Sequence, residues 1–200
     1  MTDDRAQRHR ARMARRKARV DAGIAAAAQD KGLLLVLTGP GKGKSSSALG
    51  MLARALGHGH KAAVVQFIKG RSDTGEEAFF RHQPGVDWQV CGEGFTWETQ
   101  SREQDIAAAR AGWAVAARAL ADPAINLVVL DELTYLFSYG YLDLSTALAN
   151  ITARPPMQHV VVTGRAAAQA LIDAADTVSD IGDLKHAFRA GVRAQPGIDW

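Results

Sequence analysis

The sequence predicts an α/β protein with a mostly parallel sheet and helices on both faces. Short apolar segments alternate with longer alanine-rich segments, which is the order typical of strands joined by helical crossovers. The apolar segments are nearly continuous rather than alternating with polar residues, as expected for strands buried on both sides. The chain has 200 residues, of which 47% are hydrophobic, so we expect one domain with a substantial core.

The amino-terminal segment is strongly basic and is predicted to form a helix outside the sheet. Residues 1–20 contain seven Arg and one Lys against two Asp, a net charge of +6 in a chain whose total is +3. We expect a helix over residues 4–29, stopped before Gly32. Residues 1–20 contain no Phe, Trp or Tyr for base stacking and no clean apolar stripe. Nucleic-acid binding and membrane binding are therefore not favoured.

Five segments have the length and composition of strands. Each is a run of five to seven residues that contains β-branched side chains, and four of the five runs are mainly aliphatic, which favours strands buried in a sheet. The predicted strands are residues 33–37, 62–68, 86–90, 125–130 and 159–163.

Between these strands lie segments with the length and composition of helices. One of them opens with Ser101 and has Gln104 three positions later. This spacing is typical of a capping box, in which the two side chains satisfy backbone N–H groups at the helix start. The predicted helices are residues 45–57, 101–122, 144–153 and 165–176.

The strongest local signal is a glycine-rich loop between the first strand and the next helix. Residues 38–46 read TGPGKGKSS. Glycines in such a loop let backbone N–H groups face phosphates, and the helix that follows presents its positive end. Lys44 would add a charge, and Ser45 would offer a hydroxyl to Mg²⁺. The usual spacing has a glycine where this chain has Thr38, so the loop is a variant phosphate loop.

A second acidic signal lies at the end of the fourth predicted strand. Residues 126–133 read NLVVLDEL, so Asp131 and Glu132 follow a buried strand, as in a Walker B sequence. Ligands of an open α/β sheet bind at the carboxyl ends of the strands, which places these carboxylates near the phosphate loop. Either carboxylate can hold a hydrated Mg²⁺. Glu132 can alternatively orient an attacking water.

Composition also excludes some classes of protein. The single cysteine, Cys91, cannot form an intramolecular disulfide or a multi-cysteine metal cluster. The longest aliphatic run, residues 33–37, is too short to cross a membrane. The amino terminus has no apolar core followed by a small-residue cleavage site, so no secretory signal is expected. These features favour the cytoplasm.

Several further strings resemble one family. Residues 92–103 read GEGFTWETQSRE, residues 128–142 read VVLDELTYLFSYGYL, and residues 185–200 read KHAFRAGVRAQPGIDW. Together with VVQFIKG at 64–70, VVVTGR at 160–165 and the variant loop, they closely resemble the P-loop corrinoid adenosyltransferases, from about Val20 to Trp200. The resemblance implies a RecA-like P-loop fold and an alkyl transfer. In that reaction the 5′-deoxyadenosyl group of ATP moves to the cobalt(I) of cobalamin or of a corrinoid precursor, and triphosphate leaves intact.

The resemblance also implies roles for particular residues. Ser45 and Glu132 would hold a divalent ion, Mg²⁺ or Mn²⁺, and Phe95 and Trp97 would face the corrin and exclude a lower cobalt ligand. Residues 1–30 would form a lid over the corrinoid and residues 31–200 the transferase domain. The triphosphate would be bound by the loop residues Gly39, Pro40, Gly41, Lys42, Gly43, Lys44, Ser45 and Ser46.

The family is commonly homodimeric, and we expect a flavoprotein as electron donor. The chain departs from the family pattern at Pro40, where Asn is common, at Ser45, where Thr is common, and at Gly140. Pro40 removes one backbone donor from the loop.

Two other classes of protein fit the phosphate loop alone: an ATPase or nucleic-acid motor, in which Glu132 activates water, and a regulator that binds ATP without consuming it.

Overall fold

The computed structural model describes residues 2–68, 74–91 and 101–199 of the chain. Its centre is a parallel sheet, in which the strands lie in the order β3-β2-β4-β5-β1-β6. The chain therefore crosses from β1 to β2 over two other strands, so β4 and β5 lie between them. The strands are β1 Leu34–Thr38, β2 Ala62–Gln66, β3 Val86–Val90, β4 Leu127–Asp131, β5 His159–Thr163 and β6 Thr177–Asp180.

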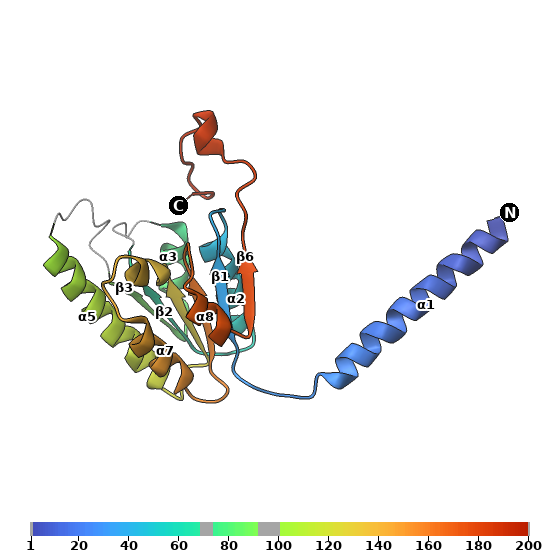
Figure 1. Cartoon of the computed structure of the whole chain (residues 1–200), viewed down its shortest axis with the longest axis horizontal. Helices are drawn as coiled ribbons and strands as arrows, with labels where there is room; N and C mark the ends of the chain where they lie inside the picture. The colour runs from blue at the N-terminus through green and yellow to red at the C-terminus, as the bar shows by residue number, and fades with distance from the viewer. Residues whose placement is uncertain (1, 69–73, 92–100, 200) are drawn as a thin grey trace. The chain divides into compact units, whose positions relative to one another are not determined.

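Helices cover both faces of this sheet (Figure 1). Helices α5, α7 and α8 pack on one face, and α2 and α3 pack on the other. This is the α/β architecture that the sequence predicts, and the parallel sheet flanked by helices is consistent with a RecA-like P-loop fold. The helices are α1 Thr2–Ala26, α2 Lys44–Gly57, α3 Gly75–Phe80, α5 Arg102–Ala121, α6 Thr134–Ser138, α7 Leu144–Thr152, α8 Gln169–Ala174 and the 3₁₀-helix η1 Ala187–Ala190.

The two core clusters follow from the alternation of side chains along each strand. In β4, Val128 and Leu130 belong to the cluster under α5, whereas Leu127 and Val129 belong to the cluster under α2. All four are at most 4% exposed. A strand with apolar side chains on both faces must be covered on both sides, so the continuous apolar runs in the sequence require helices on each face.

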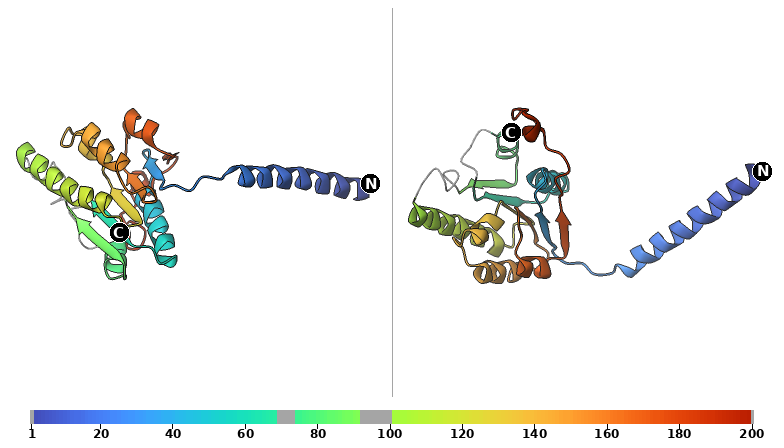
Figure 2. Two further views of the ribbon diagram at one scale, coloured as in Figure 1. Left: turned by 90° about the horizontal axis from the view of Figure 1, so that it is seen from below. Right: turned by 45° about the horizontal axis from the view of Figure 1, so that its top comes forward.

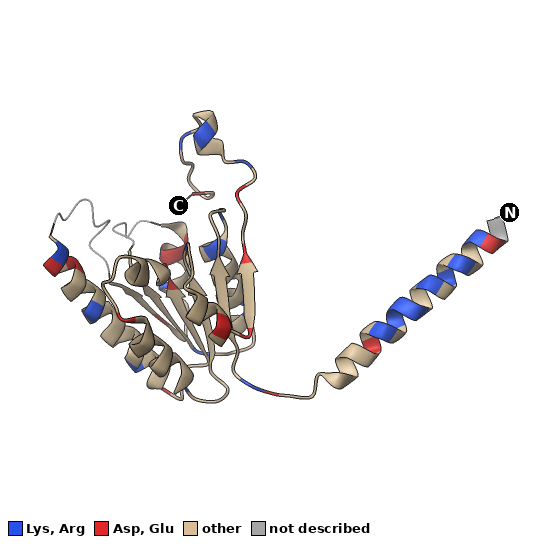
Figure 3. Cartoon of the chain, viewed as in Figure 1, with Lys and Arg blue, Asp and Glu red and all other residues tan. Residues whose placement is uncertain are grey.

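The amino-terminal helix forms a separate unit. Contacts between Cα atoms divide the chain into Met1–Lys31 and Gly32–Trp200. The described side chains of α1, from Asp4 to Ala26, are exposed, and Lys and Arg positions, blue in Figure 3, recur along most of the helix. Ion pairs between Arg8 and Asp4, at 2.6 Å, and between Lys17 and Asp21, at 2.5 Å, link successive turns.

Two of the predicted elements differ in the structure. The predicted helix over 165–176 is reduced to α8, because the chain turns sharply before it: Gly164 and Ala166 have positive φ angles, of 140° and 50°. The Thr134 hydroxyl donates to the Arg165 carbonyl at 2.7 Å, so this carbonyl is bound to a neighbouring element instead of a helix. The predicted capping box is wrong, since Ser101 precedes α5 but its side chain makes no capping hydrogen bond.

The sequence did not predict β6, α3, α6 or η1. All four residues of β6 are exposed, so the strand lacks the apolar run that marks the others. After β6 the chain continues past the carboxyl ends of the strands, through η1, and returns to the edge where β1 ends (Figures 1 and 2). None of the helices in the described part of the chain is long and apolar enough to cross a membrane.

Candidate functional site

The phosphate loop joins β1 to α2 and has the backbone shape that its glycines allow. Gly39 and Gly43 have φ angles of 97° and 115°, in the region that residues with a Cβ rarely adopt. Lys44 begins α2 and is only 6% exposed. Its Nζ atom donates to the carbonyls of Gly39, at 2.9 Å, and Gly41, at 2.6 Å. An ammonium has three donors, so a further one can serve a phosphate oxygen.

Close packing against the chain leaving β6 fixes the first half of this loop. The Gly41 N–H donates to the Ile181 carbonyl at 2.7 Å, and the Ile181 N–H donates to the Thr38 carbonyl at 2.8 Å. A Cβ on Gly41 would lie 2.3 Å from the Gly182 carbonyl oxygen, and one on Gly39 would lie 2.2 Å from Asp180 Oδ1. Glycine is therefore required at both positions by neighbouring backbone and side-chain atoms.

A cavity of about 490 Å³ lies over the second half of the loop. Its walls come from the loop, the start of α2, α3, the segments that follow β2, β4 and β5, and the carboxyl-terminal segment. Gly39 and Pro40 lie outside its described lining, and Phe95 and Trp97 lie outside the described residues. The predicted site residues that line it are Gly41, Lys42, Gly43, Lys44, Ser45, Ser46 and Glu132.

The structure separates the two carboxylates at the end of β4. Asp131 is 2% exposed; its Oδ1 accepts from the Thr163 hydroxyl at 2.8 Å and its Oδ2 from Gln66 Nε2 at 2.9 Å. Glu132 has a φ angle of 61°, and its N–H donates to Thr163 Oγ1 at 2.9 Å. Asp131 therefore joins neighbouring strands inside the sheet, while Glu132 lines the cavity beside Lys44 and Ser45.

The electrostatics of the cavity centre on Lys44. Burial lowers the pKa of its ammonium below the ordinary value, and the Arg165 guanidinium lowers it further, while the Glu132 carboxylate acts in the opposite direction. Burial also raises the pKa of Tyr135, and Glu132 raises it again, so the Tyr135 phenol is protonated near neutral pH. An anion in the cavity would favour the charged form of Lys44, because opposite charges stabilise each other.

Five polar residues that line the cavity were not predicted as site residues: Glu76, Tyr135, Arg165, His186 and Asp199. The Glu76 Oε2 atom is buried and has no hydrogen-bond partner within the described part of the chain, so it is an acceptor available to a ligand. Arg165 directly follows the strand-and-glycine pattern VVVTG, which is a signal of the same kind as the loop after β1. His186 and Asp199 belong to the string at 185–200, whose place in the fold cannot be read from its sequence.

A second cavity, of about 740 Å³, is lined by parts of α5, α6 and α7 and by the turn before α8. It contains Arg110, Tyr141 and several apolar side chains. No residue of the phosphate loop is among those that line it. The smaller cavity, which combines two lysines with the loop glycines, is therefore the candidate phosphate site.

Comparison with known proteins identifies the family. Residues 30–200 match the family described as ATP:corrinoid adenosyltransferase BtuR/CobO/CobP. The chain belongs to this family. Residues 1–24 separately match the amino-terminal region described for cob(I)alamin adenosyltransferases. The predicted activity, ATP-dependent adenosyl transfer to a corrinoid, is thereby confirmed at the level of the family.

Three relatives named as corrinoid adenosyltransferases match along nearly all of their length. A corrinoid adenosyltransferase of Pseudomonas aeruginosa is 62% identical over 195 residues, which cover 97% of this chain and 96% of the relative. The corrinoid adenosyltransferase CobA of Salmonella typhimurium is 48% identical over 200 residues and all of both chains. A corrinoid adenosyltransferase of Escherichia coli K12 is 46% identical over the same extent.

The packing of the loop against the chain leaving β6 predicts contrasting effects for two glycines. Gly41→Ala forces the loop or the Gly182 carbonyl to shift, so we expect ATP affinity to fall by about tenfold or more, about 1.4 kcal/mol. In Gly50→Ala, on the open side of α2, the added Cβ meets nothing within 4 Å, and we expect a gain of up to about 1 kcal/mol in unfolding free energy. Titration calorimetry with a non-reactive ATP analogue and thermal unfolding measure both effects. Unchanged ATP affinity in Gly41→Ala would contradict the role given to this packing.

Proposed function

We propose that the cavity over the phosphate loop holds the triphosphate of ATP, with the 5′ carbon of the ribose directed toward the cobalt of a corrinoid. The observation that supports this most is the meeting of Lys44, Ser45 and Glu132 on one cavity wall. Lys44 lies at the start of α2, where the helix dipole and backbone N–H groups favour an anion. The loop binds the triphosphate, which leaves the ribose at the open side of the cavity.

The chemistry needs no nucleophile from the protein. Cobalt(I) supplies an electron pair that forms a bond to the 5′ carbon of ATP, while the bond from that carbon to the triphosphate oxygen breaks. The triphosphate leaves with the electrons of the broken bond, and cobalt is formally oxidised from the +1 to the +3 state. Because the corrinoid carries the reactive centre, the protein contributes binding, orientation and electrostatic stabilisation.

The side chains of the cavity suit the leaving group. Negative charge grows on the triphosphate as the bond breaks, and donors placed beforehand stabilise such charge in the transition state. Lys44 already has its Nζ fixed by two loop carbonyls, so little reorganisation is needed. Arg165 and the protonated Tyr135 phenol line the same cavity and can donate to phosphate oxygens.

The residues present also fit a divalent ion. Mg²⁺ binds in proteins through one or two carboxylates together with substrate phosphates and waters, and the Ser45 hydroxyl and the Glu132 carboxylate line one cavity. Mg²⁺ or Mn²⁺ there would neutralise part of the triphosphate charge. In the described part of the chain no group of three or more His, Cys, Asp or Glu could hold a metal ion by itself, which fits an ion held jointly with the nucleotide.

The corrin side of the site is proposed from the family resemblance. Phe95 and Trp97 lie between β3 and α5 in the sequence, outside the described residues. We assign them to the lower face of the corrin, where apolar rings would keep water and the corrinoid's own base away from cobalt. Losing that ligand makes reduction to cobalt(I) easier. We also propose that helix α1 forms a lid over the corrinoid. The protein is further proposed to be a cytoplasmic homodimer that receives electrons from a flavoprotein.

The nature of the product tests the proposed function. With ATP, a divalent ion and chemically reduced corrinoid, we expect adenosylcorrinoid and inorganic triphosphate in equal amounts. A nucleic-acid motor would instead give ADP and phosphate, and a binding regulator would give no product. Lys44→Ala should lower the transfer rate by about 10² to 10³, the usual cost of removing such a donor. A folded Lys44→Ala protein with near-normal turnover would remove this cavity from the reaction.

Adjacent carboxylates provide a matched test of the metal site. Glu132→Gln should raise the Mg²⁺ or Mn²⁺ concentration needed for half-maximal transfer by about tenfold, because an amide is a poorer ligand for a hard cation. Asp131→Asn should lower stability by about 2 kcal/mol, since it disturbs buried hydrogen bonds to a charged group, with little change in metal requirement. Metal titrations of the transfer rate and chemical unfolding separate the two. Equal metal requirements in wild type and Glu132→Gln would exclude Glu132 as a ligand.

A double variant tests the corrin assignment of Phe95 and Trp97. Replacing both by Ala should block transfer that starts from cobalt(II), because a lower ligand would return to cobalt and hinder its reduction. Supplying corrinoid already reduced to cobalt(I) should restore much of the rate, whereas Lys44→Ala should show no such rescue. Electron paramagnetic resonance of bound cobalt(II) should show four-coordinate features only when both rings are present. If the double variant transfers as slowly to cobalt(I) corrinoid as it does when it starts from cobalt(II), the two rings act in positioning or packing instead.

A further inference from the structure

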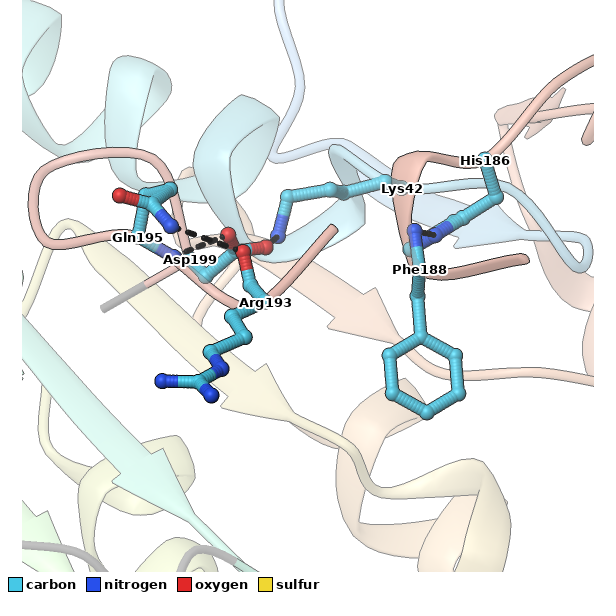
Figure 4. A network of polar contacts seen from close by, with 6 residues as sticks. All are labelled: Lys42, His186, Phe188, Arg193, Gln195 and Asp199. Atoms are coloured by element: carbon cyan, nitrogen blue, oxygen red, sulfur yellow. Dashed lines mark hydrogen bonds and ion pairs between the residues drawn. The ribbon is translucent and has the colours of Figure 1, made fainter. Parts of the chain in front are cut away.

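The carboxyl-terminal segment brings a negative charge to the phosphate loop. Asp199 Oδ1 lies 2.6 Å from Lys42 Nζ, although 156 residues separate the two positions. The side chains of Lys42 and Asp199 are 47% and 24% exposed, respectively, and both line the cavity over the loop. Figure 4 shows the Lys42 side chain extending from the loop toward this carboxylate. This ion pair therefore lies on the wall of the proposed triphosphate site.

The Asp199 carboxylate is held by its own turn as well as by Lys42. Its Oδ2 accepts from the Gln195 N–H at 2.8 Å, and the Asp199 N–H donates to the Gln195 carbonyl at 2.8 Å. Gln195 Nε2 donates in turn to the Arg193 carbonyl at 3.0 Å. The carboxylate would thus keep its place if Lys42 moved away. The hydrogen bond from Lys42 lowers the pKa of Asp199, and the Gln195 N–H lowers it further, so the group is ionised at neutral pH.

An ionised carboxylate in this position opposes a bound triphosphate in two ways. It repels the phosphate oxygens directly, and it binds one of the two loop ammonium groups that would otherwise attract them. Lys44 is committed to the loop carbonyls and buried, whereas Lys42 has a long, half-exposed side chain that can exchange one anion for another. We propose that Asp199 competes with triphosphate for Lys42 and thereby speeds release of the triphosphate product.

This inference rests on the proposed location of triphosphate over the loop. The proposed exchange gives Lys42 an anionic partner both with and without bound triphosphate. When triphosphate leaves, the ammonium passes to Asp199, so release exchanges one ion pair of Lys42 for another, and at this half-exposed side chain the two pairs differ by only a modest energy. ATP loses the same contribution to affinity, but the negative charge on the leaving group is greatest after the bond has broken. The effect therefore bears most strongly on the product.

Binding of inorganic triphosphate tests the inference without any corrinoid. Asp199→Asn keeps the size of the side chain and an oxygen for the Gln195 N–H but removes the charge. We expect Asp199→Asn to lower the dissociation constant of Mg²⁺-triphosphate by about fivefold, since a half-exposed ion pair contributes less than a factor of ten. Asp199→Glu should return toward the wild-type value. Asp183→Asn is the matched control, because Asp183 belongs to the same segment but pairs with Arg189 and does not line the cavity.

A second comparison shows whether Asp199 acts through Lys42. In a Lys42→Gln background, Asp199→Asn should change triphosphate affinity by less than twofold, because the ion pair is already absent. In stopped-flow displacement experiments, the single Asp199→Asn variant should release triphosphate more slowly than wild type, so its higher affinity should come from a lower dissociation rate. A loss of affinity in Asp199→Asn would overturn the inference, since it would show that Asp199 orients Lys42 for binding. Unchanged affinity would overturn it as well.

The same experiments separate this inference from the proposed function. If wild-type protein binds no triphosphate while adenosyl transfer proceeds, the proposed location of triphosphate fails and the inference fails with it. If wild-type protein binds triphosphate and Lys44→Ala does not, but Asp199→Asn behaves like wild type, only the role of Asp199 fails. Thermal unfolding of each variant identifies any loss that comes from misfolding, and Asp199→Glu then provides the binding comparison.

Discussion

The site depends on the close packing of the phosphate loop against the chain that leaves β6. Backbone hydrogen bonds join Thr38 and Gly41 to Ile181, and neighbouring atoms leave no room for a Cβ on Gly39 or Gly41. This contact shapes the loop whose carbonyls hold Lys44. It also fixes the starting point of the carboxyl-terminal segment, which returns over the loop and adds His186, Ile198 and Asp199 to the cavity. A four-residue edge strand thus supports both sides of the site.

The strand order explains why residues far apart in the sequence meet there. Strands β4, β5 and β1 are neighbours in the sheet, so the loop after β1, Glu132 after β4 and Arg165 after β5 all lie at the same edge. Thr163 joins two of these elements, since its hydroxyl donates to Asp131 and accepts from the Glu132 N–H. Ligands of open parallel sheets bind at this edge because loops of different strands meet there. Small side-chain contacts at the strand ends then determine which carboxylate faces the ligand.

Much of the fold could be predicted because its signals are local. The five predicted strands and the helices at 45–57, 101–122 and 144–153 correspond to elements of the structure within about two residues at most ends, since apolar runs and helical composition depend on neighbours in the sequence. Strand β6 gave no such signal because all four of its residues are exposed. The choice between Asp131 and Glu132 depends on Thr163 and Gln66, which come from other strands. The pairing of Lys42 with Asp199 joins an early loop to the end of the chain, and no local pattern indicates it.

The charges of the cavity suggest that the site is balanced rather than simply positive. Lys42, Lys44 and Arg165 face Glu76, Glu132 and Asp199 around one space. A cavity that attracted ATP and the transition state equally would not lower the barrier of the chemical step. In the role proposed for it, the Asp199 carboxylate reduces the affinity for both ATP and triphosphate, while donors aimed at the leaving oxygens keep their effect in the transition state. With Glu132 proposed to hold the divalent ion, Asp199 is the acidic residue that would favour turnover over tight binding, which suits an enzyme whose product is a polyanion.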